Sequence, residues 1–267
     1  MAELQNANKH CILITSGAVA FGKQRLAQEI MLSKSMRDTI QSNTKEEDAV
    51  QINNLKKPNA AVGQSGLQAL YETMFRNYGI IVAQVLVTTP DFYNDHTRDH
   101  LLQTMDELLK LNIIPIINTN DAISALPVTD AIMSRGGRLP ITDNDSLAAN
   151  LAVATKADLC VLMSDVEGIY DAPPNKQGEA RVLHTFNPED KEKVEFGEKS
   201  LTGTGGMESK VDSALWALER GVPSVICNGM GHNTLRKIMG GRREGTFFTT
   251  ADTDVMPVEV LAKNGNY

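Results

Sequence analysis

The most informative part of the chain is the glycine-rich segment Gly203-Thr204-Gly205-Gly206-Met207-Glu208-Ser209-Lys210, which leads directly into a predicted helix. Glycines allow close backbone approach, so several N–H groups can converge on one anion. The helix N-terminus adds partial positive charge, and Lys210 can supply a full charge to a phosphoryl group. The spacing is not that of the P-loop or of the dinucleotide-binding turn. The segment therefore predicts a phosphate-binding loop, with a flexible glycine hinge as the alternative.

A second polar cluster, Asp143-Asn144-Asp145, begins another predicted helix. Because Leu147 and Leu151 continue on its buried stripe, the two acids fall in the first turn. There they can cap the helix, or they can bind a substrate ammonium and orient basic groups around a transferring phosphoryl group. Two acids flanking an asparagine exceed what a cap needs, so we expect both roles.

Four short apolar runs, each typical of a buried strand, end in small polar or glycine-containing clusters. The clusters are Thr15-Ser16-Gly17-Ala18, Asn118-Thr119-Asn120-Asp121, Ser164-Asp165 and Asn228-Gly229. Ligands of open α/β sheets bind beyond the carboxyl ends of the strands. Four such clusters in phase indicate one polar site along a sheet edge, with simple turns and helix caps as the alternative.

Neither the histidines nor the cysteines form a metal site by their spacing. His96 and His100 are four residues apart, but no third ligand is evident, so a surface pair is the simpler interpretation. Cys11, Cys160 and Cys227 each lie in an apolar run without a C-x-x-C pairing. An odd number of buried thiols favours a reducing compartment.

These residues must be positioned by alternating strands and helices. Strands are predicted at residues 11–14, 80–87, 113–117, 159–163 and 224–227, and helices around 67–78, 101–109, 143–154 and 208–220. Continuously apolar strands alternating with helices predict an α/β fold, a three-layer α-β-α sandwich with a mainly parallel sheet.

Two polar stretches interrupt this alternation. Residues 33–58 are expected to form an exposed excursion, either a solvated loop or surface helix or an oligomer contact. Residues 175–199 are expected to form a mobile flap or hairpin beside the site.

Composition excludes several classes of protein. The 267 residues are 42% hydrophobic and 22% charged, as in an average globular protein, which excludes a disordered or fibrous chain. The net charge of -7, without any Lys/Arg block, disfavours nucleic-acid binding. No apolar stretch approaches the length of a membrane span, and residues 1–9 resemble neither a signal nor a transit peptide.

The polar clusters, in this order, resemble the amino-acid kinase family and, within it, glutamate 5-kinase. The matching pieces are Thr15-Ser16-Gly17-Ala18, Ala61-Val62-Gly63-Gln64-Ser65, Ile117-Asn118-Thr119-Asn120-Asp121-Ala122, Asp143-Asn144-Asp145, Ser164-Asp165 and the segment 203–210. Residues 164–171 and 214–218 are similar to the kinase half of animal pyrroline-5-carboxylate synthase. The resemblance covers about residues 10 to 250.

The resemblance implies ATP-dependent phosphorylation of the L-glutamate γ-carboxylate to glutamyl 5-phosphate, the first step of proline biosynthesis. Lys210 and Asp145 would be catalytic, and glutamate would be held by Ser16, Gly17, Ala18, Asp121 and Asn144. ATP, with Mg²⁺ bridging its phosphates, would be held by Ser164, Asp165, Thr204, Gly205, Gly206, Met207, Glu208, Ser209 and Lys210. Phosphoryl transfer depends on such positioning and charge stabilisation more than on covalent chemistry.

The chain departs from the family pattern at its start. Members of the family begin with a strand that ends in a lysine and a glycine-rich turn, and no such segment precedes Thr15. We therefore expect residues 1–250 to be a kinase domain that lacks this N-terminal strand, and 251–267 to be a C-terminal tail or the start of a linker. On this interpretation the 267 residues alone would be poorly soluble and inactive.

Other consequences of the resemblance concern partners and location. It implies a homo-oligomer, with proline or ornithine as a feedback ligand, in the mitochondrial matrix as for the animal enzyme or otherwise in the cytoplasm. Two alternatives stay open. One is an amino-acid kinase with a different acceptor, such as acetylglutamate, aspartate or carbamate. The other is a non-catalytic subunit that binds nucleotide or amino acid.

Overall fold

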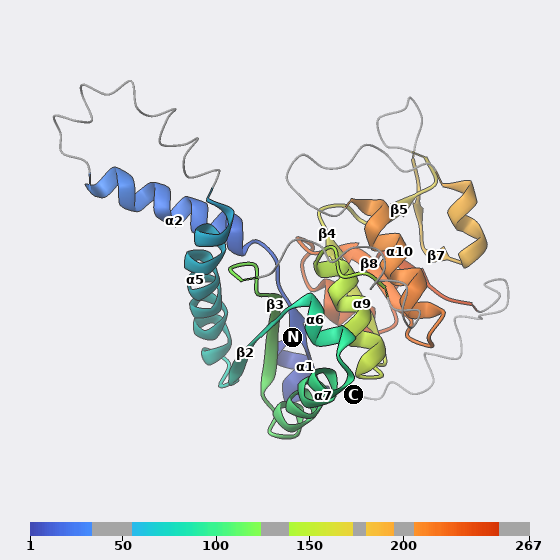
Figure 1. The fold of residues 1–267 in the computed structure, drawn as a ribbon. Helices are drawn as coiled ribbons and strands as arrows, with labels where there is room; N and C mark the ends of the chain where they lie inside the picture. Colours follow the sequence, from blue (N-terminus) through green and yellow to red (C-terminus); the bar gives the residue numbers. More distant parts are fainter. Residues whose placement is uncertain (34–54, 124–138, 173–179, 195–205, 251–267) are drawn as a thin grey trace, which may run out of the picture. The chain divides into compact units, whose positions relative to one another are not determined.

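The computed structural model describes residues 1–33, 55–123, 139–172, 180–194 and 206–250 (Figure 1). The chain divides into two compact units, Met1–Val128 and Thr129–Tyr267. Each unit has its own sheet, and each is described by itself. In the part of the chain described, no helix combines the length and the apolar character that crossing a bilayer requires.

The sheet of the first unit is parallel and has the order β1-β3-β2. The short β1 (Leu13–Ile14) and the longer β2 (Val82–Val87) flank β3 (Ile114–Thr119), with Ile14 opposite Ile117 and Val87 opposite Thr119. All residues of β3 except the last are buried. A central parallel strand is covered on both faces, which explains its continuously apolar sequence. The carboxyl ends of all three strands share one edge.

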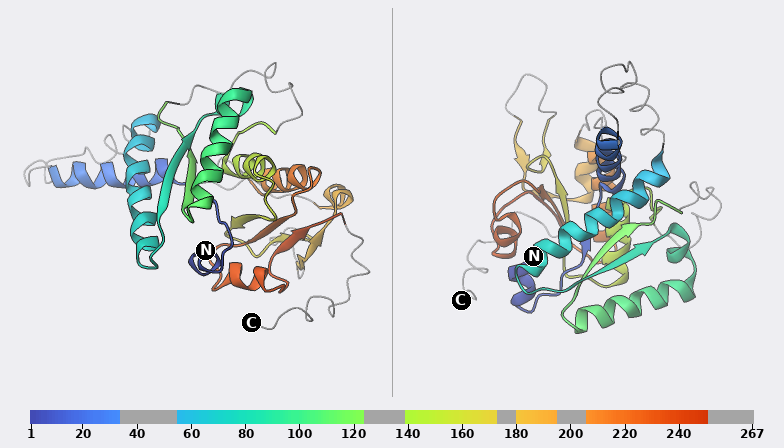
Figure 2. Two further views of the ribbon diagram at one scale, coloured as in Figure 1. Left: turned by 90° about the horizontal axis from the view of Figure 1, so that it is seen from below. Right: turned by 90° about the vertical axis from the view of Figure 1, so that its left-hand side faces the viewer.

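Helices lie on both faces of this sheet. Figure 2 shows the strands between α5 (Lys56–Arg76) on one side and α7 (Asp95–Lys110) on the other. Within the described residues, the unit also contains α1 (Ala2–Asn6), α2 (Ala18–Ser33) and α6 (Thr89–Tyr93), none of which was among the predicted elements. The layered α/β arrangement predicted from the sequence is thus present in this unit.

At its C-terminal end the predicted excursion at residues 33–58 is helical and exposed, in agreement with the surface helix that was one of the expected forms. Leu55 is the N-cap of α5, so Pro58 lies in the first turn of that helix rather than in a loop. Proline is tolerated there because the first N–H groups of a helix have no intrahelical partner. Residues 34–54 of the predicted excursion lie outside the described part of the chain.

Helices α2 and α5 approach each other at two glycines. A Cβ placed on Gly22 would lie 1.8 Å from the carbonyl oxygen of Asn59, and one on Gly63 would lie 1.7 Å from that of Ala18. Such backbone contact is possible only without side chains at these positions. Gly63 therefore brings α5 against the first residue of α2, directly beside Gln64.

The second unit has a mixed sheet of order β4-β8-β9-β7. Strands β4 (Cys160–Ser164) and β8 (Ser224–Asn228) are parallel, β9 (Thr246–Phe248) runs antiparallel to β8, and β7 (Thr185–Phe186) is parallel to β9. Helices α9 (Asn144–Ala154) and α10 (Met207–Leu218) pack against each other and against β4. A further helix, α11 (Thr234–Met239), follows β8.

A small antiparallel pair is formed by β5 (Ile169–Tyr170) and β6 (Val182–Leu183), and a 3-10 helix, η1, follows at Pro188–Lys193. The second strand of this pair falls within residues 175–199, where a flap or hairpin was expected. Residues 175–179 and 195–199 of that region lie outside the described part. All five predicted strands and all four predicted helices are confirmed, with shifts of a few residues at their ends apart from α5 and α7, which begin earlier than the patterns indicated.

Candidate active site

The first turns of α9 and α10 are joined by an ion pair between Asp145 and Lys210. Lys210 Nζ lies 2.8 Å from Asp145 Oδ1 and 2.9 Å from Oδ2, so it donates to both carboxylate oxygens. The side chains are only 16% and 18% exposed, respectively, for Lys210 and Asp145. Burial raises the pKa of Asp145, and the charge and hydrogen bond of Lys210 oppose this shift without cancelling it. A partly desolvated ammonium is thereby fixed beside two helix N-termini.

Asp143 connects the same two helices one residue before α9 begins. Its carboxylate accepts from Ser146 N at 2.8 Å, and Asp143 N donates to Ser146 Oγ, which forms a capping box. Its other oxygen accepts a hydrogen bond from Ser209 Oγ of α10. Burial raises the pKa of Asp143, but the hydrogen bonds from Ser209 and Ser146 and the nearby charge of Lys210 outweigh it, so the net shift is downward. Both predicted roles, cap and site component, are compatible with this geometry.

Asn144, the first residue of α9, holds an unused acceptor. Its Oδ1 atom is buried and has no hydrogen-bond partner within the described ranges. Buried polar atoms are nearly always paired, so this oxygen is available to accept a hydrogen bond from a ligand or to coordinate a cation. Among the residues that the structure describes, no three His, Cys, Asp or Glu side chains gather into a metal site.

The glycine-rich segment enters α10 through Gly206, which is its N-cap and makes no side-chain capping bond. Met207, Glu208, Ser209 and Lys210 form the first turn. Lys210 N donates to Gly206 O at 3.3 Å, and the N–H groups that precede it at the helix start lack intrahelical acceptors. This is the arrangement that binds anions at helix N-termini. Thr204 and Gly205, predicted to contact ATP, lie outside the described residues.

Ser164 and Asp165 lie at the carboxyl end of β4, as predicted. Ser164 Oγ donates to Asp165 Oδ1 at 3.2 Å, and Gly229 N donates to Ser164 O at 2.8 Å. Asn228, at the end of the neighbouring β8, donates to Glu167 Oε1 at 2.7 Å. Two of the four predicted polar strand ends are therefore adjacent at the edge of this sheet.

In the first unit, Ser16 and Gly17 connect β1 to α2. Gly17 has a φ of +94°, a conformation that a residue with a Cβ rarely adopts, and its carbonyl accepts from Phe21 N in the first turn of α2. Ser16 is exposed, whereas Ala18, at the start of α2, is 4% exposed. The short turn places Ser16 directly before a helix N-terminus.

A cavity of about 270 Å³ lies beside this turn, within the first unit. Asp121 and Ala18, both predicted to bind substrate, line it, and Asp121 Oδ1 accepts from Thr119 Oγ1 at 2.7 Å. The other lining residues are Ala60, Ala61, Gln64, Ser65, Gln84, Leu86, Thr119, Asn120 and Ala122. Of these, Gln64 belongs to a motif that matches the family, but no role could be assigned to it from the sequence.

Comparison with known proteins agrees with these features. The family model described as "Amino acid kinase family" matches residues 1–228. The chain belongs to the amino acid kinase family. It is 41% identical over 249 residues to delta-1-pyrroline-5-carboxylate synthase 1 of Oryza sativa subsp. japonica, covering 92% of this chain and 33% of that protein. It is 34% identical over 250 residues to glutamate 5-kinase of Symbiobacterium thermophilum, covering 93% of this chain and 84% of the relative.

The chain spans about a third of the length of the pyrroline-5-carboxylate synthases that it matches: it covers 33% of the rice protein and 36% of the Solanum lycopersicum protein. The motifs of the chain suggested the animal form of this enzyme, whereas these two relatives are plant proteins. Among solved structures, isopentenyl phosphate kinase superposes with a TM-score of 0.54 at 16% identity, covering 93% of this chain and 88% of that one. This likeness supports the amino acid kinase fold alone.

Proposed function

We propose that this amino acid kinase transfers the γ-phosphoryl group of ATP to the γ-carboxylate of L-glutamate. A carboxylate oxygen attacks the γ-phosphorus, the bond from that phosphorus to the bridging β,γ-oxygen breaks, and ADP leaves with the electron pair. No proton is transferred, because a carboxylate is a competent nucleophile without a general base. The products are glutamyl 5-phosphate and ADP.

The observation that carries this proposal is the Lys210–Asp145 pair between the N-termini of α9 and α10. Charge on the equatorial phosphoryl oxygens increases or redistributes during transfer, and a fixed cation in a water-poor position stabilises it. In this proposal Lys210 contacts the moving phosphoryl group and Asp145 holds Lys210 in place. The proposal is also supported by the 34% identity to a glutamate 5-kinase that the chain covers over 84% of its length.

ATP would be held by the first turn of α10, from Gly206 to Lys210, and by Ser164 and Asp165 at the end of β4. Mg²⁺ prefers oxygen ligands, and Asn144 Oδ1, unpartnered among the described residues, would be one of them, whereas both oxygens of Asp145 accept from Lys210. When bound, Mg²⁺ would neutralise charge on the β- and γ-phosphates. Asn144 Oδ1 could instead accept from the glutamate ammonium, as the resemblance implies.

Glutamate would be held by groups of the first unit, in the cavity that Asp121 and Ala18 line. Asp121 would bind the ammonium, and Ser16 with the free N–H groups at the start of α2 would bind a carboxylate. A homo-oligomer, feedback by proline or ornithine, and a mitochondrial location remain predictions of the resemblance.

The test is acyl-phosphate formation, measured by hydroxylamine trapping with ATP, Mg²⁺ and a panel of acceptors. Glutamate should support turnover and N-acetylglutamate, aspartate and carbamate should not. Lys210→Ala should lower turnover by on the order of a hundredfold, with Lys191→Ala as a matched control outside the site. Turnover with another acceptor alone would refute the substrate assignment, and binding of ATP and glutamate without turnover would favour a binding subunit.

A further inference from the structure

The cavity beside Asp121 contains a glutamine whose amide is held in one orientation. Gln64, on α5, is 9% exposed and lines the cavity. Its Oε1 atom accepts a hydrogen bond from Asn118 Nδ2 at 2.9 Å. Asn118 is 2% exposed at the end of the central strand β3. Both amides are thus buried where a wrong orientation would leave polar atoms unpaired.

The orientation follows from a backbone donor. The N–H of Thr119 donates to Asn118 Oδ1 at 2.9 Å, and a backbone N–H can only donate. Asn118 therefore presents its NH₂ group to Gln64, and Gln64 must present its oxygen to Asn118. The NH₂ group of Gln64 is left over, and none of the described residues accepts a hydrogen bond from it.

The side chain of Thr119 contacts Asp121 in the same cavity. Thr119 Oγ1 donates to Asp121 Oδ1 at 2.7 Å, which leaves Oδ2 for a cation. One cavity is therefore lined by an anionic acceptor and by a neutral double donor. An α-amino acid carries an ammonium and a carboxylate on one carbon atom, and these two groups match Asp121 and Gln64 in charge and in hydrogen-bonding sense.

We propose that Gln64 recognises the α-carboxylate of the substrate through its NH₂ group, and that Asn118 is the positioning residue that fixes this orientation. This inference rests on the proposed function, because it assumes a glutamate whose γ-carboxylate reacts while its α-carboxylate is only bound. It assigns specificity for α-amino acids to the first unit, through Asp121 and Gln64 together.

Two truncated analogues test the assignment. 4-Aminobutyrate is glutamate without the α-carboxylate, and glutarate is glutamate without the ammonium; both keep the reacting carboxylate. The measurements are kcat/KM by hydroxylamine trapping, and the inhibition constant against glutamate where an analogue turns over too slowly. Gln64→Met should lower kcat/KM for glutamate by about 10- to 100-fold, the range expected for the loss of a hydrogen bond to a charged group. The same variant should change kcat/KM or the inhibition constant of 4-aminobutyrate by no more than about threefold, and it should leave the KM for ATP unchanged.

Gln64→Glu keeps the acceptor for Asn118 but replaces the NH₂ donor with a charged oxygen. It should therefore lower kcat/KM for glutamate, relative to 4-aminobutyrate, at least as much as Gln64→Met does. Gln68→Met, one turn further along α5 and outside the cavity lining, is the matched control. Equal losses for glutamate and 4-aminobutyrate in Gln64→Met would overturn the proposal and leave Gln64 a structural role.

The positioning role of Asn118 has a separate test. Asn118→Asp keeps the acceptor for Thr119 N but loses the donor to Gln64, so the Gln64 amide should flip and present its oxygen to the cavity. The kcat/KM for glutamate should then fall relative to that for 4-aminobutyrate, and this effect should vanish in the Gln64→Met background. An effect that persists in that background would show that the new charge acts directly, and would overturn the positioning role.

The outcomes separate this inference from the proposed function. Wild-type chain that phosphorylates only an acceptor other than glutamate refutes the function, and the inference with it. If the wild-type chain phosphorylates glutamate but Gln64→Met leaves the ratio of kcat/KM for glutamate to that for 4-aminobutyrate unchanged, the inference alone is refuted.

Discussion

Replacing Lys210 with methionine should separate the stabilising and the catalytic contributions of the Lys210–Asp145 pair. At 2.8 Å, two unit charges attract by about 6 kcal/mol for an effective dielectric constant of about 20, and desolvation offsets most of this. Removal of Lys210 leaves Asp145 charged, 18% exposed and unpaired. Breaking a buried pair costs about 3–5 kcal/mol, and the residual exposure places this one at about 2–3 kcal/mol.

The double variant Lys210→Met/Asp145→Asn should recover most of this loss, because no charge remains to be desolvated. Neither variant should recover turnover, which should stay at least about a hundredfold below wild type. The stability deficit of Lys210→Met should also depend on pH. Burial raises the folded pKa of Asp145 above 3.8, so the penalty applies only while the carboxyl is ionised. It should be complete at pH 7 and shrink as the pH falls toward 3.8.

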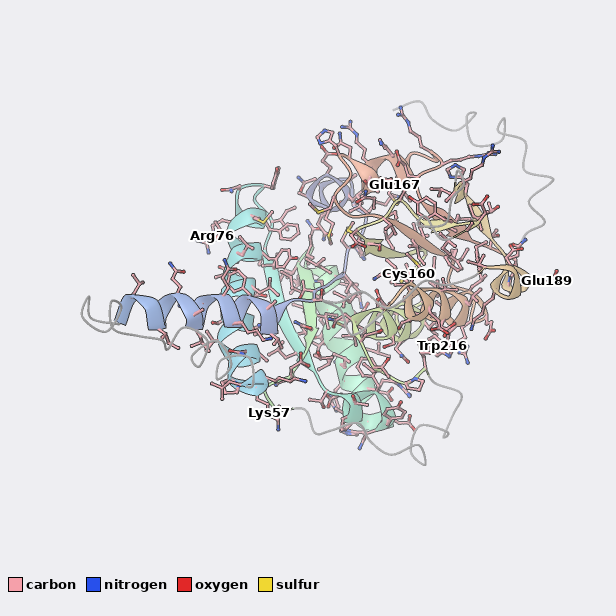
Figure 3. All side chains as sticks on the ribbon, turned by 90° about the horizontal axis from the view of Figure 1, so that it is seen from above. Lys57, Arg76, Cys160, Glu167, Glu189 and Trp216 are labelled. Carbon is pink, nitrogen blue, oxygen red and sulfur yellow. The ribbon has the colours of Figure 1, made fainter. Side chains whose placement is uncertain are left out.

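Urea unfolding at several pH values measures these effects. Trp216, the only tryptophan of the chain, lies on α10 (Figure 3). The same helix carries Lys210, so the fluorescence of Trp216 reports on this unit. Lys191→Met, which removes an ion pair with Asp212 whose side chains are 44% and 43% exposed, is the control and should cost less than about 1 kcal/mol. A double variant that is no more stable than Lys210→Met would refute the reasoning, as would a deficit independent of pH.

Three further outcomes are expected. Asp121→Ala should raise the KM for glutamate far more than that for ATP in steady-state assays, and equal effects would place Asp121 outside the amino-acid pocket. Gly63→Ala should lower the free energy of unfolding by about 2 kcal/mol or more, because the new Cβ would lie 1.7 Å from a backbone oxygen. Gly66→Ala should lower it less, because its Cβ would contact only the ring of a side chain. Similar urea midpoints for the two variants would contradict this. Burial raises the pKa of Cys160 to about 12 and that of Cys227 to about 11, from 9.0, so unfolding should become easier above pH 9 by up to about 1.4 kcal/mol per pH unit for each thiol. Cys160→Ala should reduce that slope, and an unchanged slope would contradict the assignment.

Much of the fold was predictable because its central strands are covered on both faces. Residues 113–117 and 224–227 are continuous apolar runs, and the structure places them in β3 and β8, where nearly every position is buried. The first turn of α5 was not assigned to that helix, since Pro58 and the lysines before it are typical of a loop. Short elements such as β7 and β9 have only two and three residues, too few for a pattern to be recognised.

The site was predictable to the extent that its residues follow strands or begin helices. Helical periodicity alone could place Asp145 and Lys210 in first turns and Asp143 at the start of its helix, where it proves to be the N-cap. It could not predict that Asp145 and Lys210, 65 residues apart in sequence, pair across two helices. Gln64 lies in the middle of α5, where a glutamine is ordinarily a surface residue. Its role depends on Asn118, 54 positions away, and no local pattern carries that contact.

The role proposed for Lys210 gives its double hydrogen bond to Asp145 a further consequence for nucleotide binding. A free lysine side chain carries about 2 kcal/mol of rotamer entropy, and here that freedom is already lost on folding rather than on binding. The pair is neutral as a whole, so it attracts the ground-state phosphates only weakly. Charge that increases or redistributes on the phosphoryl group during transfer can interact with the ammonium more strongly than the intact nucleotide does. In the proposed role the pair would favour differential binding of the transition state, and ADP would leave without breaking a strong contact to an unpaired cation.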